Sequence, residues 1–355
     1  MRDVLDVDVL VAFSGGVDSC LTALLLRREG YRVAGIIMSV RDPLHPTGQG
    51  CGMKEDIAAA QALANHIEMP LIVADCADAY RSAVIDYFRA EYLAGRTPNP
   101  CVQCNPLIKF GLLPKIARTR GARFHHFATG HYANIEYSEA DNAWLLKRGV
   151  DTAKDQSYFL YRLSQEQLAS TWFPLGRYRK TEVRRLAAEL NVPVHDKPDS
   201  QDFSIGDYAE LIGKPPMEGD IVMSDGTVMG KHQGYWNFTP GQRKGLGIAY
   251  TEPLFVIRVV PECNRVVVGT RHEHMRSECV IDNPVFHLPQ PDPGTVLLGR
   301  MRSSQSPHEM SIGNAPRDGA LAVHFAKPQH GVAAGQSIVF YRDDFVVGGG
   351  VITEK

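Results

Sequence analysis

The sequence lacks any apolar run long enough to cross a membrane. Its longest hydrophobic runs, such as residues 34–38, fall far short of the roughly 20 residues that a spanning helix needs. The first eight residues carry three aspartates and one arginine and contain no apolar segment of the kind found in secretory signals. We therefore expect a cytoplasmic protein with no membrane-spanning segment.

The chain also has almost no net charge and few cysteines. It contains 38 Lys and Arg against 40 Asp and Glu, which gives a net charge of −2. This balance excludes a histone-like or tail-driven nucleic-acid binder but allows local basic faces. Seven cysteines, an odd number in a chain of 355 residues, predict reduced thiols rather than a disulfide scaffold.

The first part of the chain alternates short apolar runs with helical patterns. This alternation is typical of an α/β fold with a doubly wound parallel sheet. Strands are predicted at 7–13, 33–38, 71–74 and 124–130, and helices at 18–28, 54–66, 80–93, 108–119 and 179–190.

After about residue 205, glycine and proline become frequent and helical patterns disappear. Short β-branched runs separated by turn residues predict two small all-β modules. The predicted domains are therefore 1–205 (α/β), 206–277 (central β) and 278–355 (C-terminal β-barrel). The Pro-rich stretch 288–293 is either a junction between β modules or a loop within one.

The sharpest local motif is the segment FSGGVDS at 13–19, which follows an apolar strand and opens a helix. Glycines at such a turn let the backbone approach a ligand, and the amides at the helix start bind phosphate. The P-loop pattern GxxxxGK[ST] and the dinucleotide pattern GxGxxG are both absent. The segment instead resembles the PP-loop of ATP pyrophosphatases, which cleave ATP to AMP and pyrophosphate and adenylate a substrate oxygen.

That resemblance implies that the domain 1–205 is catalytic and holds a site for ATP and Mg²⁺. The implied ATP-binding residues are Ala12, Phe13, Ser14, Gly15, Gly16, Val17, Asp18 and Ser19. Asp18 is also a candidate catalytic residue that would help to order Mg²⁺. Met38 ends the second predicted strand, where α/β sheets place ligands, although a packed core methionine is an equally good interpretation.

A second motif is GRTPNPCVQCN at 95–105, where two prolines stiffen a predicted exposed turn. Its two thiols, Cys101 and Cys104, form a CxxC pair. In a reducing compartment such a pair indicates redox, persulfide or metal chemistry.

Together with further segments, these motifs resemble the tRNA-specific 2-thiouridylase family, the tRNA-uridine 2-sulfurtransferases. The resemblance covers nearly the whole chain. The further motifs include ATGHYA (128–133), KDQSYFLYRL (154–163), FPLGRYRKTEVR (173–184), FTPGQRKGLG (238–247) and GQSIVFY (335–341).

The resemblance implies ATP-dependent adenylation of the C2 oxygen of the wobble uridine, followed by sulfur transfer to C2. It places Gly130 in the ATP site and Cys104 at the position of a sulfur-handling cysteine. The residues that it implies for tRNA contact are Asn99, Pro100, His131, Lys154, Asp155, Gln156, Arg302 and Gln336. The partners it implies are tRNA and a sulfur donor, which is a cysteine desulfurase, a sulfur carrier or free sulfide.

The chain departs from the family pattern at its cysteines. The family carries a second catalytic cysteine after a KPDSQ-type motif, but residues 198–206 contain none, and Cys101 stands where the family has Asp. Three hypotheses follow. Cys101 and Cys104 relay a persulfide, or they ligate an iron–sulfur cluster such as [4Fe–4S] with Cys51 or Asp202 as a third ligand, or the protein does not thiolate at all.

Several basic runs, including 109–123 and 177–185, offer faces for a polyanion. Two alternatives to a 2-thiouridylase remain at this point. One is a PP-loop enzyme that adenylates another substrate, and the other is a non-catalytic RNA- or metal-binding relative.

Overall fold

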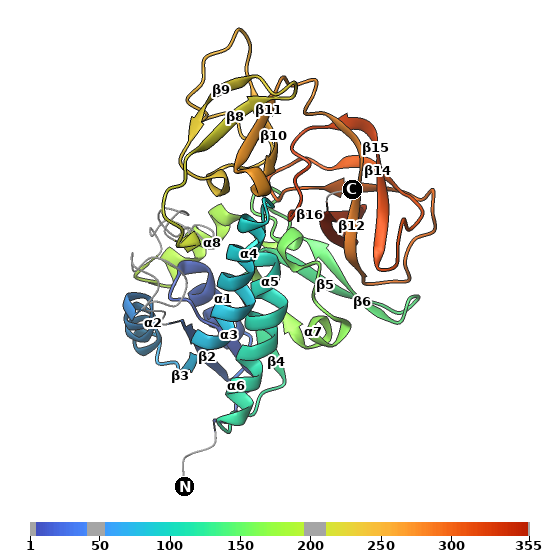
Figure 1. Ribbon diagram of the computed structural model, residues 1–355. Helices are drawn as coiled ribbons and strands as arrows, with labels where there is room; N and C mark the ends of the chain where they lie inside the picture. The colour runs from blue at the N-terminus through green and yellow to red at the C-terminus, as the bar shows by residue number, and fades with distance from the viewer. Residues whose placement is uncertain (1–4, 41–53, 195–210, 354–355) are drawn as a thin grey trace. The chain divides into compact units, whose positions relative to one another are not determined.

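The computed structural model describes residues 5–40, 54–194 and 211–353 and divides the chain into two compact units (Figure 1). Unit 1 comprises Met1–Val84, Cys101–Ile205 and Asp344–Val346, and unit 2 comprises Ile85–Pro100, Gly206–Asp343 and Val347–Lys355. The chain thus enters unit 2 twice before its C-terminal part. The predicted boundaries at 205 and 277 remain a prediction.

Unit 1 is built on a parallel sheet of five strands in the order β3-β2-β1-β4-β7. The strands are β1 (Val9–Ala12), β2 (Val33–Ser39), β3 (Leu71–Asp75), β4 (His126–Ala128) and β7 (Thr171–Trp172). Consecutive residues of β1, Val9 to Val11, are fully buried, as expected for a strand covered on both faces. The α/β prediction with a parallel sheet is therefore confirmed.

Helices account for the burial of both faces of this sheet. The helices of unit 1 are α1 (Val17–Arg28), α2 (Lys54–His66), α3 (Ala77–Tyr80), α5 (Pro100–Cys104), α6 (Leu113–Thr119), α7 (Gln165–Ser170) and α8 (Lys180–Glu189), and α4 (Tyr87–Leu93) belongs to unit 2. Val9, Val11 and Phe13 pack in one core with buried residues of α1 and α2. On the other side, α6 contacts β2 and β3.

The segment around the two cysteines differs from the prediction of an exposed turn. Pro100 begins α5, and the helix continues through a π-helical stretch (Asn105–Leu112) into α6. Proline suits the first turn of a helix because its missing N–H would have no intrahelical partner there. The helix predicted at 108–119 therefore begins eight residues earlier and contains both thiols.

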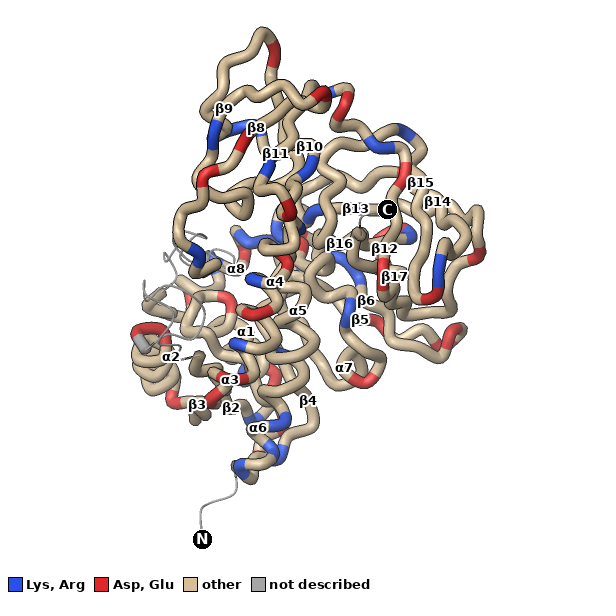
Figure 2. The backbone as a smooth tube through the Cα atoms, viewed as in Figure 1, with Lys and Arg blue, Asp and Glu red and all other residues tan. Residues whose placement is uncertain are grey.

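Unit 1 also contains a hairpin that the sequence did not predict. Its strands, β5 (Ala133–Ser138) and β6 (Ala143–Arg148), pair antiparallel, and Phe345 pairs with Lys147 of β6. The run of basic residues at 109–123 lies on the π-helical stretch, α6 and the turn after it, where Figure 2 shows Lys and Arg in blue.

Unit 2 contains two all-β modules. The first has strands β8 (Gly219–Met223), β9 (Val228–His232), β10 (Phe255–Val260) and β11 (Arg265–Gly269) in the order β10-β11-β8-β9. The second has strands β12 (Arg276–Phe286), β13 (Val296–Arg300), β14 (His308–Ile312), β15 (Ala320–Gln329), β16 (Ser337–Arg342) and β17 (Phe345–Thr353). Pairing of β12 with both β15 and β17 closes the second module into a barrel.

The barrel decides whether the Pro-rich stretch joins two β modules or is a loop within one. The Pro-rich stretch 288–293 lies between β12 and β13, so it is a loop within a module. In the part of the chain that the structure describes, no helix is both long and apolar enough to span a membrane.

Candidate nucleotide and sulfur-transfer site

The strand order fixes where a ligand can bind in unit 1. β1 lies between β2 and β4, and the chain runs outward from β1 on both sides. In such sheets ligands bind beyond the carboxyl ends of the strands at this switch point. Two predicted segments meet there. Residues 13–19 (the nucleotide loop) follow β1, and Thr129 to His131 follow β4.

Gly15 and Gly130 allow the backbone around the nucleotide loop to pack closely. A Cβ at Gly130 would lie 3.0 Å from the backbone carbon of Asp18, so only glycine fits there without a shift. Gly15 has φ +77°, and a Cβ there would lie 3.0 Å from the Cα of Ala60 in α2. Both positions bring backbone against backbone around the nucleotide loop.

The nucleotide loop leaves the start of α1 open to a ligand. Gly16 is the N-cap residue and offers no side-chain cap to the first amides of the helix. Ser19 Oγ donates a hydrogen bond to the carbonyl of Gly16 at 3.0 Å and lies 3.3 Å from Ser14 Oγ. Uncapped amides at the positive end of a helix dipole are suited to phosphate oxygens.

Asp18 is held by two side chains that the motif analysis had not assigned to the site. Lys180 Nζ lies 2.8 Å from both carboxylate oxygens, and the hydroxyl of Tyr132 donates to Oδ1 at 2.8 Å. Lys180 is buried at the start of α8, and its own backbone N–H donates to Asp151. It thus brings an ammonium group to a loop whose motif contains no lysine.

The sequence analysis did not single out Lys180, which lies in a basic run and in the motif at 173–184. Its neighbours Arg179 and Arg184 are exposed, whereas Lys180 shares the buried face of α8 with Val183 and Ala187. Two signals were available: this helical spacing, and the absence of a lysine in the nucleotide loop, which implied that a cation must come from elsewhere.

Two further predicted ATP contacts lie at the carboxyl edge of the sheet. Ala12 ends β1 opposite Ile36, and Met38 lies next to the end of β2 opposite Ala74. Met38 is half-buried, which is compatible with a side chain that packs against both the core and a ligand.

His131 is buried in an aromatic setting next to the nucleotide loop. Its Nδ1 lies 2.6 Å from the hydroxyl of Thr129, and its ring lies 5.7 Å from Phe110 and 5.8 Å from Phe173, measured between centroids. Burial, with a smaller effect of Lys109, holds the pKa of His131 well below its usual value. The imidazole is therefore neutral near pH 7 and cannot act as a cation.

Cys101 and Cys104 lie one helical turn apart in α5, so both side chains project from the same side of the helix. Both are half-buried and neither is in a disulfide. By contrast, burial raises the pKa of Cys20 to about 12, and that of Cys76 to about 11. Those two thiols are poor nucleophiles and pack in the core.

The cysteine helix is anchored to the segment 154–167. Gln103 accepts a hydrogen bond from Arg162 at 2.8 Å, and Asn105 donates to the carbonyl of Phe159 at 3.1 Å. Gln167 donates to the carbonyl of Pro106 at 2.8 Å inside the π-helical stretch. π-Helical turns are frequent at functional sites, and this one adjoins the second thiol.

The predicted RNA-contacting triplet at 154–156 splits into different environments. Lys154 is exposed, whereas the Asp155 carboxylate is fully buried and accepts hydrogen bonds from the backbone of Gly149 and Ser157. Gln156 Oε1 accepts from the backbone N–H of Tyr132 at 3.0 Å. Asp155 and Gln156 therefore support the loop around Tyr132, and only Lys154 is placed to meet a polyanion.

Of the predicted contacts in unit 2, Gln336 lies against the segment that leads into the cysteine helix. Gln336 Nε2 donates to the carbonyls of Thr97 and Pro98 at 2.9 and 3.3 Å. Asn99 is half-buried and Pro100 is buried. Arg302, also half-buried, donates to the carbonyl of Pro240 at 3.3 Å.

Cys51 and Asp202, the candidate third ligands of a cluster, lie outside the described residues. Within the described ranges, no group of three or more His, Cys, Asp or Glu side chains is arranged to hold a metal ion. The two thiols of α5 alone do not make a complete set of cluster ligands.

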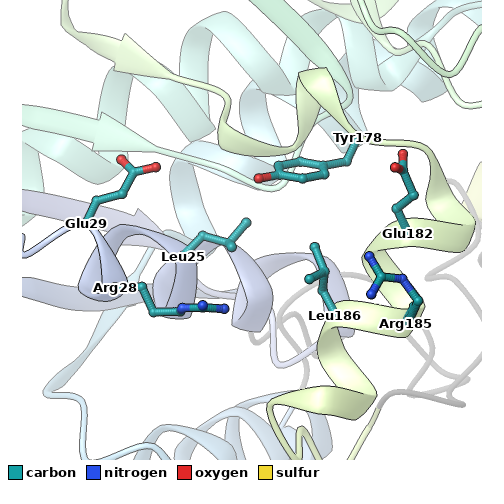
Figure 3. Close-up of a pocket in the computed structure, with 7 residues that line it drawn as sticks. All are labelled: Leu25, Arg28, Glu29, Tyr178, Glu182, Arg185 and Leu186. Carbon is teal, nitrogen blue, oxygen red and sulfur yellow. The ribbon is translucent and has the colours of Figure 1, made fainter.

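A pocket of about 290 Å³ between α1 and α8 is distinct from the nucleotide loop (Figure 3). It is lined by Leu25, Arg28, Glu29, Tyr178, Glu182, Arg185 and Leu186. Its α1 residues lie near the C-terminal end of the helix, whereas the nucleotide loop is at the N-terminal end.

Comparison with known proteins agrees with this architecture. Residues 7–205 match the family described as tRNA methyl transferase HUP domain, 211–270 the tRNA methyl transferase PRC-barrel domain, and 276–352 the aminomethyltransferase beta-barrel domain. The tRNA-specific 2-thiouridylase MnmA of Endomicrobium trichonymphae is 42% identical over 98% of this chain and 99% of that protein. The chain belongs to the tRNA-specific 2-thiouridylase family.

Other members of the 2-thiouridylase family match over similar lengths. MnmA of Clostridioides difficile is 39% identical over 98% of each chain. MnmA of Geotalea uraniireducens is 42% identical over 97% of this chain and 94% of that protein. The family resemblance inferred from the sequence motifs is therefore confirmed.

Proposed function

We propose that this protein is an ATP-dependent tRNA-uridine 2-sulfurtransferase that acts in the cytoplasm on the wobble uridine. The observation that carries the proposal is the nucleotide loop with its Lys180–Asp18 pair, in the same unit as a helix that presents two thiols. The first feature suits cleavage of ATP at its α-phosphate, and the second suits delivery of sulfur. A methyl transfer needs neither feature.

The first step activates a poor leaving group. The C2 oxygen of the uracil attacks the α-phosphorus of ATP, the bond to the β-phosphate breaks, and the N3 proton is lost. Pyrophosphate leaves into the open amides at the start of α1, where Ser14 and Ser19 add hydroxyl donors. The target base must leave the anticodon stack to reach the site.

Mg²⁺ fits this site through Asp18. Its carboxylate belongs to the nucleotide loop and is 29% exposed, and Mg²⁺ prefers carboxylate and phosphate oxygens as ligands. A bound Mg²⁺ would supply charge stabilisation on the phosphates. Lys180 and Tyr132 hold Asp18 in position, and Lys180 adds the positive charge that the P-loop lysine supplies in other nucleotide sites.

The second step replaces the activated oxygen with sulfur. One cysteine of α5 carries a persulfide received from the sulfur donor, and its terminal sulfur attacks C2 and displaces AMP. The other cysteine attacks the inner sulfur, which breaks the S–S bond and leaves the outer sulfur on C2. The transferred sulfur is reduced, and Cys101 and Cys104 are oxidised to a disulfide that a cellular dithiol then reduces.

An iron–sulfur cluster is the second candidate for sulfur delivery. Cys101 and Cys104 would be two of its ligands, and the third would have to come from Cys51 or Asp202, outside the described residues. The relay needs only the two thiols of α5, whereas the cluster needs a further ligand. Anaerobic purification followed by iron and acid-labile sulfide analysis distinguishes the two, because a colourless protein that thiolates tRNA excludes the cluster.

The function is tested by two measurements on the purified protein. Pyrophosphate release from ATP should depend on added tRNA, and mass spectrometry of the tRNA nucleosides should then find 2-thiouridine when a persulfide donor is supplied. Pyrophosphate release without tRNA, on a small acceptor, would instead identify a PP-loop enzyme with another substrate. No release under either condition would identify a non-catalytic relative.

A further inference from the structure

The two side chains that hold Asp18, those of Lys180 and Tyr132, are themselves held by one short segment of unit 1. Residues 151–156 form a turn between β6 and the 3₁₀-helix Ser157–Leu160, and we call them the supporting turn. The tip of this turn, 152–154, is exposed. One end of the turn bonds to the main chain of Lys180, and the other end bonds to that of Tyr132.

Asp151, at the start of the supporting turn, fixes the main chain of Lys180. Its Oδ2 accepts a hydrogen bond from the backbone N–H of Lys180 at 2.9 Å, and its Oδ1 accepts one from the N–H of Ala153 at 3.2 Å. Lys180 is the first residue of α8, so this N–H has no partner within its own helix. The Asp151 carboxylate thus fixes the point from which the Lys180 side chain extends to Asp18.

Gln156, at the end of the supporting turn, fixes the main chain of Tyr132 by two hydrogen bonds. Its Oε1 accepts from the N–H of Tyr132 at 3.0 Å, and its own N–H donates to the carbonyl of Tyr132 at 2.9 Å. A Cβ on Gly149 would lie 2.8 Å from the same carbonyl oxygen, so the chain also packs closely there. These contacts fix the backbone from which the buried Tyr132 side chain extends to Asp18.

The supporting turn is itself held in place by the buried carboxylate of Asp155. This carboxylate accepts hydrogen bonds from the N–H of Gly149 at 3.1 Å and from the N–H and hydroxyl of Ser157 at 3.2 and 3.1 Å. Arg148 Nε donates to it at 3.4 Å. Displacing a buried carboxylate from several donors is costly. The two ends of the turn therefore hold Lys180 and Tyr132 from one fixed frame.

We infer that Asp151 and Gln156 are positioning residues for the Mg²⁺·ATP site, each of which acts through one of the two side chains that hold Asp18. A metal ligand binds best when its orientation is fixed before the metal arrives, and the groups around the ligand supply that orientation. Asp151 would act through Lys180, and Gln156 through the hydroxyl of Tyr132. The inference rests on the proposed function in taking Asp18 as the ligand of Mg²⁺.

The test measures the affinity for Mg²⁺·ATP by isothermal titration calorimetry without tRNA, so that the result does not depend on turnover. Gln156→Met removes the acceptor at similar length and should weaken binding about tenfold, the lower end of the range for groups that orient a metal ligand. Gln156→Glu retains an acceptor oxygen and should bind as the wild type does. Gln165→Met is the matched control, because Gln165 Oε1 likewise accepts from a main-chain N–H, that of Trp144 in β6, at 2.8 Å.

A double variant shows whether Gln156 acts through the Tyr132 hydroxyl. If it does, Gln156→Met should weaken binding about tenfold in the wild type but less than about twofold in the Tyr132→Phe background. A role confined to local folding would not depend on that hydroxyl. Equal effects in the two backgrounds, in proteins whose circular dichroism is unchanged, would overturn the inference, as would a Gln156→Glu protein that binds as weakly as Gln156→Met.

Asp151 is tested in the same way, and this second test holds even if Gln156→Met does not fold. Asp151→Ala should weaken Mg²⁺·ATP binding about tenfold in the wild type and less than about twofold in the Lys180→Met background. Asp225→Ala in unit 2 is the control, because Asp225 Oδ1 also accepts from the N–H two residues further along the chain, that of Thr227, at 2.9 Å. Equal effects of Asp151→Ala in the two backgrounds would contradict the inference.

The outcomes separate this inference from the proposed function. Wild-type protein that binds Mg²⁺·ATP but releases no pyrophosphate with tRNA would contradict the proposed function, and the double variants would still confirm or overturn the positioning roles. Folded Gln156→Met and Asp151→Ala proteins that bind Mg²⁺·ATP as tightly as the wild type would overturn the inference and leave the proposed function intact. Wild-type protein that binds no Mg²⁺·ATP would overturn both.

Discussion

The nucleotide loop of unit 1 and a pocket of about 360 Å³ in unit 2, whose lining includes Arg271, His274, Arg302 and His330 (the basic pocket), are built in different ways. The loop uses backbone amides from one run of seven residues at a strand–helix turn. The pocket uses side chains from segments between residues 241 and 331. Backbone sites need a particular local conformation, which a short motif can encode, whereas side-chain sites need only that distant segments fold together. The first kind can therefore be found in a sequence and the second cannot.

Lys180 is an exception to this difference, because its side chain comes from a distant part of the chain and contacts the nucleotide loop. We expect Lys180→Met to lower tRNA-dependent pyrophosphate release by about 100-fold, the usual cost of losing one preorganised charge-stabilising donor. Lys180→Arg should retain part of the activity, since it keeps the charge but not the fit to Asp18. Steady-state kinetics with saturating tRNA measures both effects, and Arg179→Met, an exposed neighbour, is the matched control.

If the activity lost in Lys180→Met equals the fraction of protein that is no longer folded, Lys180 has a purely structural role. Circular dichroism and Tm of the same samples separate the two cases. If activity survives in a folded Lys180→Met protein, the loop functions through its backbone alone, and the contrast with the basic pocket becomes complete.

A substitution at Gly130 tests whether close backbone packing shapes the nucleotide loop. In Gly130→Ala the new Cβ meets the backbone of Asp18 at 3.0 Å, so the nucleotide loop must shift. Overpacking of this kind costs about 1–3 kcal/mol, and we expect the KM for ATP to rise about tenfold. Gly121→Ala is the control, because nothing lies within 4 Å of a Cβ there, although its φ of +90° also strains alanine. Equal KM values in the two variants would contradict the proposed packing.

The smallest expected effect comes from two of the buried histidines, His131 in unit 1 and His274 in unit 2. Folded protein keeps His274 neutral because its pKa is about 4, whereas an unfolded chain protonates it near the usual value of 6.5. Its contribution to stability is thus complete above pH 6.5 and is lost as the pH falls toward 4. Between pH 7 and 4.5, the free energy of unfolding should therefore fall by about 2 kcal/mol more in the wild type than in His274→Gln.

Hydrogen exchange of the barrel strands β12 and β15 at several pH values measures this difference without assuming that both units unfold together. His131, whose pKa is also lowered, should give an effect of the same sign in unit 1. An unchanged pH profile in His274→Gln would mean that folding does not lower the pKa of this imidazole.

Much of unit 1 was predictable because its signals are local. The apolar runs of β1 and β2 and the motif FSGGVDS defined the parallel sheet and the nucleotide loop. The cysteine segment was misjudged because Pro98 and Pro100 suggested a turn, although Pro100 occupies the first helical position, where proline is favoured. The hairpin β5–β6 was missed although β5 (ANIEYS) alternates apolar and polar residues; β6 (AWLLKR) lacks this alternation, and most residues of both strands are only partly buried.

The sequence by itself determined the family, the α/β class and the identity of the chemical groups, which are a phosphate-binding turn and a pair of thiols. Only the tertiary structure decided which side chains serve them. It paired Lys180 with Asp18 across 162 positions of the chain, placed the Asp155 carboxylate in the interior, and gathered arginines around His274. The physical reason is that a charge or an imidazole acts through its neighbours within a few ångströms, and those neighbours are set by packing rather than by sequence spacing.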